Sequence, residues 1–137
     1  MKEPVENKDI CEINTGNYTN VLKAVHDNID DYVGKKIKFS GYVYRMFDFQ
    51  ENQFVLARDM IISSDFQTVV VGFLCSCHEI TNYENGTWVE IEGTITKVDY
   101  HGTMPMIQVQ SIRTIEKPVD EYVYPPDESF VATSTIL

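Results

Sequence analysis

The segment Cys75-Ser76-Cys77-His78 contains two residue types that can bind a metal or do thiol chemistry. In an extended strand, Cys75 and Cys77 point to one face and His78 to the other. Zinc sites normally add a second, distant pair of ligands to such a cysteine pair. Both cysteines also follow the apolar run Val69 to Leu74, and cysteine packs readily in a core. We therefore expect core thiols and no bound metal or cofactor, with Cys75, Cys77 and His78 as the residues that a metal would need.

Tyrosine and arginine side chains form a second group with recognition chemistry. Tyr42 and Tyr44 alternate with apolar residues, and Arg45 follows them. Arg58 lies in the next apolar run, beside Asp59. Aromatic rings and guanidinium groups can stack on nucleobases, so these residues form a candidate ligand-binding surface: Tyr42, Tyr44, Arg45 and Arg58. A pairing of Arg58 with a carboxylate inside a structural network explains this arginine equally well.

Motifs of common enzyme classes are absent from the sequence. It contains no GxGxxG, GxxxxGK[ST], HExxH or GxSxG pattern. Glu90 and Glu92 share one side of a predicted strand, where paired carboxylates are usually just solvated. We therefore expect a non-catalytic protein.

The charge balance limits the classes of partner. The chain has 137 residues, with 11 basic and 21 acidic side chains and a net charge of −10. Residues 35–118 carry a net charge of −2, whereas 1–34 and 119–137 each carry −4. Nucleic-acid binders neutralise phosphates with Lys and Arg, so this balance argues against them. Three cysteines cannot form a disulfide framework, and free thiols favour a reducing compartment.

The elements that must position these residues follow from the apolar periodicity. Residues 17–33 show the spacing of an amphipathic helix, and Gly34 stands where a left-handed terminating residue belongs. The period then changes to two, which predicts five strands. They are a first strand through Ile37, Phe39, Gly41 and Val43, followed by Gln53–Ile62, Thr68–Cys77, Thr87–Tyr100 and Met104–Ile115.

The order of the elements predicts a fold class. Three strands, a longer connection from His78 to Gly86 and a two-stranded hairpin follow the order of the OB-fold, a five-stranded Greek-key barrel. Gly41 and Gly93 lie within strands, where small barrels need glycine at sharp bends. We therefore expect a mainly β, OB-like barrel with an N-terminal amphipathic helix, and an SH3-like barrel is the main alternative.

Three segments make up the predicted organisation of the chain. Residues 1–16 are expected to form a flexible acidic lead-in, and residues 17–118 the helix with the barrel. Residues 119–137 are expected to form a C-terminal extension that contains proline and tyrosine and is partly mobile. Within it, Tyr122, Val123 and Tyr124 could pack as an extended clip across the barrel.

Several segments, in this order, resemble the C-terminal soluble domain of the DUF1980 (YcgQ-like) family. The resemblance covers about Tyr18 to Pro125, and "QFVLAR" and "GTWV…G" are its most specific pieces. The similar segments are Gly34-Lys35-Lys36 with Gly41–Arg45, Asn52–Arg58, Val71–Leu74, Gly86–Val89 with Gly93–Ile95, and Ile115–Pro118 with Tyr122–Pro125.

The resemblance implies a role beside a membrane. Family members join transmembrane helices to this soluble domain, are described as permease subunits and stand next to a polytopic permease-like partner, with no enzymatic activity established. It therefore implies a non-catalytic binding or assembly module. Such a module is membrane-associated through a partner or through N-terminal helices missing here, and leans to the extracytoplasmic face. The alternative is a cytoplasmic OB-fold domain that binds an oligonucleotide or a small ligand.

The sequence departs from the family pattern in two ways. It contains no membrane helices, which fits an excised domain and a stand-alone relative equally well. Many members also carry a Cys-Cys pair after the arginine of the second strand, where this chain has Ser63-Ser64. A metal or redox role of that pair therefore does not follow for this sequence.

Overall fold

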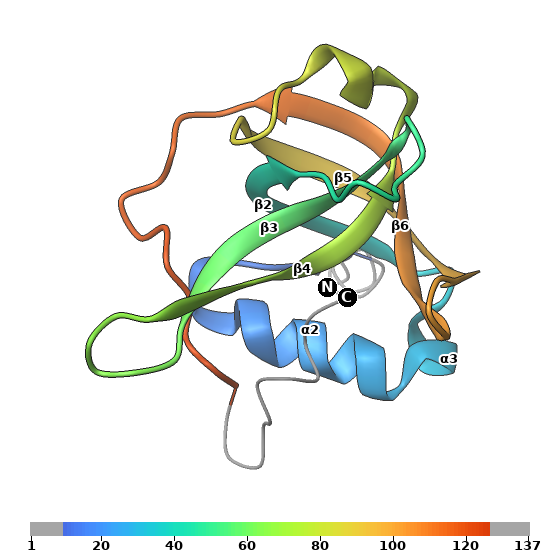
Figure 1. Cartoon of the computed structure of the whole chain (residues 1–137). Coiled ribbons are helices and arrows are strands. Elements are labelled where there is room, and N and C mark those ends of the chain that lie inside the picture. Colours follow the sequence, from blue (N-terminus) through green and yellow to red (C-terminus); the bar gives the residue numbers. More distant parts are fainter. Residues whose placement is uncertain (1–9, 127–137) are drawn as a thin grey trace, which may run out of the picture.

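Five strands close into a barrel in the computed structural model, which describes residues 10–126 (Figure 1). A short additional strand, β1 (Ile10–Glu12), pairs in parallel with the start of the first barrel strand. Residues 1–9 and 127–137, parts of the predicted lead-in and extension, lie outside the described residues. The barrel strands are β2 (Lys36–Tyr44), β3 (Gln53–Ile61), β4 (Thr68–Ser76), β5 (Trp88–Asp99) and β6 (Thr103–Thr114).

The pairing of the strands identifies the barrel as OB-like. The order is β2-β3-β4-β6-β5, and β5 pairs again with β2 to close the ring. The pairs β2–β3, β3–β4, β5–β6 and β2–β5 are antiparallel, whereas β4 and β6 run parallel. This closed Greek-key order confirms the expected OB-like fold.

Alternation along the strands directs apolar side chains into the barrel. In β2, Ile37, Phe39 and Val43 are buried, and the intervening residues are more exposed. The strand β5 shows the same alternation, with buried side chains at Val89, Ile91 and Ile95. Trp88 lies on the outer face, where its ring packs against the ring of Tyr42. The register predicted from the period of two is therefore correct.

Gly93 allows β5 to bend as the barrel closes. The register between β5 and β6 shifts between Glu92 and Gly93. A side chain at Gly93 would collide with the carbonyl oxygen of Gln108 on β6. A larger residue could not approach the neighbouring strand this closely, which agrees with the role expected for this glycine.

A helical segment covers one end of the barrel (Figure 1). It consists of η1 (Thr15–Asn17), α2 (Tyr18–Asp27) and α3 (Ile29–Tyr32). The sequence predicts one continuous helix over 17–33, but the backbone leaves the helical region at Asn28, with φ −133° and ψ 49°. Tyr18, Leu22 and Val25 bury the apolar stripe against the barrel core. Gly34 ends the segment with a φ of +93°.

The chain after β6 returns along the outside of the barrel towards α2 (Figure 1). Val123 is 1% exposed and forms an isolated parallel bridge with Met60. Its N–H donates to Asp59 O (3.1 Å), and its carbonyl accepts from the N–H of Ile61 (2.9 Å). Of the three residues expected to form a clip, Val123 is the buried one. Within residues 10–126, no helix is long and apolar enough to cross a membrane.

Candidate functional site

Arg58 is buried inside the molecule and is 3% exposed. Its guanidinium donates to Ser40 O (3.1 Å), Ser40 Oγ (3.1 Å) and Thr15 Oγ1 (3.0 Å). It also reaches the carbonyl oxygens of Asp120 (3.4 Å) and Glu121 (3.3 Å). Burial lowers the pKa of Arg58, but arginine stays charged in proteins. These contacts join the barrel to the segments before and after it, and they leave the guanidinium unavailable to a ligand.

The place of Arg58 follows from a gap along one edge of β2. The start of β2 pairs with β1 on this edge, and its end pairs with β3. Between these two partners, the carbonyl of Ser40 receives its hydrogen bond from Arg58 instead of from a strand. The side chain therefore satisfies a backbone acceptor that would otherwise be buried without a partner.

Tyr42 lies on the outer face of the barrel, beside Arg58. Its hydroxyl donates to the carboxylate of Asp59, and its ring lies 5.7 Å from that of Trp88. The Arg58 guanidinium lies 5.2 Å from the Trp88 ring centroid, a cation–π distance. Burial and the hydrogen bond to Asp59 raise the pKa of Tyr42. Tyr42 and Arg58 thus belong to one packed network.

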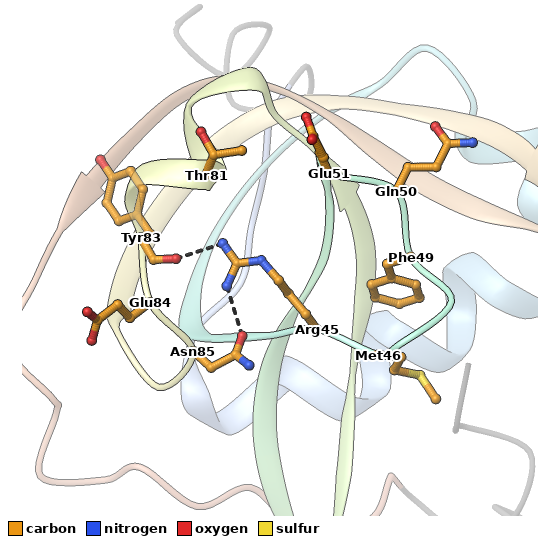
Figure 2. A pocket seen from close by; sticks show the side chains of 9 residues that line it. All are labelled: Arg45, Met46, Phe49, Gln50, Glu51, Thr81, Tyr83, Glu84 and Asn85. Atoms are coloured by element: carbon orange, nitrogen blue, oxygen red, sulfur yellow. Dashed lines mark hydrogen bonds between the residues drawn. The ribbon is translucent and has the colours of Figure 1, made fainter.

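Arg45 belongs to a different part of the surface, a cleft of about 780 Å³ (Figure 2). Its guanidinium donates to Asn85 Oδ1 (2.9 Å) and to the carbonyl oxygens of Ile80 (2.5 Å) and Tyr83 (2.6 Å). These bonds hold η2 (His78–Asn82) and the following turn against the end of β2. The cleft contains two carboxylates, and the donors of its arginine are already engaged by the protein. The residues that line the cleft are Arg45, Met46, Phe49, Gln50, Glu51, Thr81, Tyr83, Glu84 and Asn85.

Tyr44 borders an apolar groove of about 310 Å³ on the outer face of β3 and β4. The Tyr44 side chain is exposed, and Val69 and Val70 are half-buried. We call this surface the β4 groove; its lining is Tyr44, Met46, Val55, Val69, Val70, Val71 and Gly72. The four predicted ligand residues therefore do not form one surface. Tyr42 and Arg58 belong to the packed network, Arg45 lies in the cleft, and Tyr44 borders the β4 groove.

Two loops beside this face contact each other. They are the β2–β3 loop, residues 45–52, and the β5–β6 turn, residues 100–102. The Tyr100 hydroxyl donates to Asp48 Oδ1 (2.9 Å), and His101 Nε2 lies 3.6 Å from Asp48 Oδ2. The Phe49 and Tyr100 rings pack edge to face at 5.6 Å. In OB-folds the equivalent loops border the ligand groove, and here they are clasped together.

Cys75 in β4 and Cys77, between β4 and η2, both belong to the core, as their apolar context predicted. Cys75 is 0% exposed and Cys77 is 4% exposed. Burial raises the pKa of both thiols. The Cys77 thiol donates to Glu79 Oε1 at 3.3 Å. A raised thiol pKa disfavours the thiolate that both zinc binding and nucleophilic attack require.

The other candidates for metal or redox chemistry lie apart from these thiols. His78 is exposed. Ser63 lies in the β3–β4 hairpin, where its hydroxyl donates to Asp65 Oδ1 (2.5 Å) and accepts from the N–H of Gln67 (3.3 Å). Among residues 10–126, no group of three or more His, Cys, Asp or Glu side chains could hold a metal ion.

The sequence did not predict that Arg58 is buried among neutral acceptors, or that the two loops are clasped together. One signal for Arg58 was available, because it is in phase with Phe54, Leu56 and Met60, which face the core. The clasp joins Asp48 to Tyr100, 52 residues apart, and nothing in the local sequence indicates that contact.

Two curated relatives are similar over most of this chain. The UPF0703 protein YcgQ of Bacillus subtilis (strain 168) is 27% identical over 106 residues, 75% of this chain. A Streptococcus mutans protein named "Putative two-component membrane permease complex subunit" is 27% identical over 117 residues, 82% of this chain. The matches cover 37% and 42% of the two relatives, so this chain spans about two fifths of their length.

Two solved structures are similar to part of this chain. The mitochondrial single-stranded DNA-binding protein Rim1 of S. cerevisiae has a TM-score of 0.42 and 17% identity, over 61% of this chain and 96% of that one. The N-terminal domain of PriB from Thermoanaerobacter tencongensis has a TM-score of 0.40 and 18% identity, over 59% of this chain and 96% of that one. Similarity at this level carries no inference about ligands.

The family comparison covers nearly the whole described region. The model of the DUF1980 C-terminal domain matches residues 1–125. The match includes the helical segment, the complete barrel and the returning segment as far as Val123. This chain belongs to the DUF1980 C-terminal domain family.

Proposed function

We propose that this chain is a non-catalytic binding and assembly module of a two-component membrane permease system. A polytopic membrane protein is its proposed partner. The name of the Streptococcus mutans relative supports this proposal, as does membership of the family. The observation that carries it is the apolar β4 groove on the face where OB-folds bind ligands.

The chemistry of the groove suits a protein segment better than a charged ligand. Its lining consists of aliphatic residues, one methionine, one tyrosine and one glycine, without a basic side chain. Exposed apolar surface rimmed by polar residues is typical of protein contact sites. Phe47 is fully exposed in the adjoining loop and Phe66 is 73% exposed in the β3–β4 hairpin, which adds apolar surface beyond the groove itself.

The alternative, an oligonucleotide-binding domain, is not supported by the two arginines that the sequence offered for ligand binding. Arg58 is buried, and Arg45 donates to backbone carbonyls and to Asn85. Phosphate binding requires accessible Lys or Arg side chains. A small ligand in the cleft beside Arg45 would meet an arginine whose donors are already engaged.

Co-expression with the proposed partner, a polytopic permease-like membrane protein, tests the proposal. We expect the chain to sediment with membranes when this protein is present and to stay in the supernatant when it is not. Tyr44→Asp introduces a charge at the groove and should abolish co-sedimentation. Ser111→Asp introduces the same charge on the exposed face of β6 and should leave it unchanged. Sedimentation that does not depend on the membrane protein would contradict the proposed partner.

The side of the membrane forms a second part of the proposal. The family resemblance favours the extracytoplasmic face, and we propose this location. Protease added to intact spheroplasts should then degrade the chain while leaving a cytoplasmic marker protein intact. Degradation only after lysis would place the chain in the cytoplasm.

A further inference from the structure

Among the described residues, one edge of β4 has no strand partner over two thirds of its length. β4 pairs with β3 along its whole length, from Thr68 to Ser76. On its other side it pairs with β6 only from Leu74 to Ser76. That pairing begins at Met106 of β6, directly after Pro105, which has no N–H to donate. We call the unpartnered stretch from Thr68 to Phe73 the open edge; its first three residues are exposed or half-buried, and its last three are buried.

The direction of the backbone groups along this edge follows from bonds on the far side of β3. The N–H of Ile61 and the carbonyl of Asp59 both bond to Val123, so odd-numbered residues of β3 point away from β4. Even-numbered residues of β3 therefore bond to β4, and the partners of Arg58 and Met60 there are Val71 and Val69. The remaining residues of β4 direct their N–H and C=O groups to the open edge: Thr68, Val70 and Gly72.

The open edge and the β4 groove lie together. Val69, Val70, Val71 and Gly72 line the groove, and the same residues form the edge. The sequence from Phe66 to His78 contains no Asp, Glu, Lys or Arg. Exposed edges are usually protected by charges, prolines or bulges, and this stretch of β4 has no charge and no proline. The edge thus offers backbone pairing beside an apolar surface, which is the arrangement used in strand addition.

The charge of the whole chain favours one kind of occupant. The chain carries 21 acidic and 11 basic side chains and a net charge of −10. A second copy of this chain would bring the same acidic surface, whereas a segment with basic flanks would be complementary. We propose that β4 binds, by strand addition, an extended segment of a partner protein with alternating apolar residues and Lys or Arg at its ends. This inference rests on the proposed function, and it names how the membrane partner is bound.

A proline at the open edge separates backbone pairing from side-chain contact. Val70→Pro removes one outward N–H without removing a bond between β3 and β4, a position where edge strands tolerate proline. Val70→Thr keeps the N–H and the branched shape. For the full chain and the detergent-solubilised polytopic protein proposed as its partner, we expect Val70→Pro to weaken binding at least tenfold. Val70→Thr should change the affinity less than threefold. Equal urea midpoints for both variants show that they are folded.

Hydrogen exchange of the unmodified chain provides a second test that needs no variant. Exchange is carried out in the complex and read by NMR after release. Added protection should appear at the amides of Thr68, Val70 and Gly72, while Val69 and Val71 are protected in both states.

Four outcomes would contradict parts of these proposals. Tight binding by folded Val70→Pro, or no added protection at these amides in a stable complex, overturns strand addition and leaves the proposed function standing. Failure of the unmodified chain to bind the membrane protein overturns both. Self-association that Val70→Pro abolishes would make a second copy the occupant and overturn the proposed partner segment.

Discussion

Arg58 is the buried charge around which the N-terminal segment, the barrel and the C-terminal segment meet. All five of its hydrogen bonds go to neutral oxygen atoms, from Ser40, Thr15, Asp120 and Glu121. The Tyr18 and Trp88 rings lie 5.5 Å and 5.2 Å from the guanidinium. A planar group with a fork of five donors suits this set of acceptors, and a lysine ammonium does not.

Replacing Arg58 should therefore destabilise the fold. We expect Arg58→Met to lower the free energy of unfolding by about 3 kcal/mol, because it leaves several buried acceptors without a donor. Urea denaturation measures the loss. Arg113→Met is the matched control, since this exposed arginine pairs with Glu90 at the surface and should contribute less than about 1 kcal/mol. Equal losses in the two variants would show that Arg58 has no special structural role.

His26 should make the stability depend on pH. Its ring stacks on Phe73, and Nδ1–H donates to Leu22 O at 2.8 Å. Burial lowers its pKa from 6.5, while the helix carbonyl and Asp27 act in the opposite direction. As the pH falls below 6.5, His26 of the unfolded chain binds a proton, whereas His26 of the native chain does not. The free energy of unfolding therefore decreases until the pH reaches the lowered pKa of native His26.

The measurement is the free energy of unfolding at pH 7 and at pH 5. His26→Phe keeps an aromatic ring against Phe73 but cannot titrate. We expect this variant to lose less stability between the two pH values than the unmodified chain loses. Identical losses would mean that His26 does not contribute to the acid sensitivity.

At the scale of elements, the barrel strands could be predicted well from the sequence. The expected Gln53–Ile62 and Thr68–Cys77 are observed as Gln53–Ile61 and Thr68–Ser76. A barrel interior is filled mainly by apolar side chains, so alternation along β2 and β5 indicates which face of these strands is buried. Gly41 and Gly93 indicated the close approach of neighbouring strands, because a side chain at either position would collide with the adjacent backbone.

The remaining features depend on contacts between distant segments. β1 is three residues long and exists through its pairing with β2, so it has no periodicity of its own to detect. The open edge of β4 depends on its register with β6, which local sequence does not encode. The candidate ligand residues share aromatic and guanidinium side chains that can bind ligands. Residue identity alone does not distinguish an arginine that is free at the surface from one whose guanidinium donates to the protein itself.

The returning segment after β6 should contribute to stability through Val123. Val123→Ala removes buried methyl groups beside β3 and should cost about 1–2 kcal/mol. Val119→Ala makes the same chemical change at a fully exposed residue and should stay within about 0.5 kcal/mol of the unmodified chain. Thermal or urea unfolding distinguishes the two variants. Similar stabilities would mean that burial of the Val123 side chain adds nothing to the stability of the fold.

At the scale of the whole molecule, the charge separates this barrel from nucleic-acid binders. With a net charge of −10, it should not bind single-stranded DNA or RNA usefully at physiological salt. Fluorescence anisotropy with labelled oligonucleotides tests this, with an established single-stranded DNA-binding protein as the positive control. Micromolar binding that weakens as salt is added would favour the oligonucleotide alternative.

The apolar face of β3 and β4 is the proposed contact with a membrane partner. A photoreactive amino acid at position 70 lies in the β4 groove, and one at position 111 lies on the exposed face of β6. In cells that also express the polytopic permease-like protein proposed as the partner, we expect illumination to cross-link position 70 to that protein and to leave position 111 uncoupled. Equal cross-linking at the two positions, or cross-linking at position 111 alone, would contradict the claim.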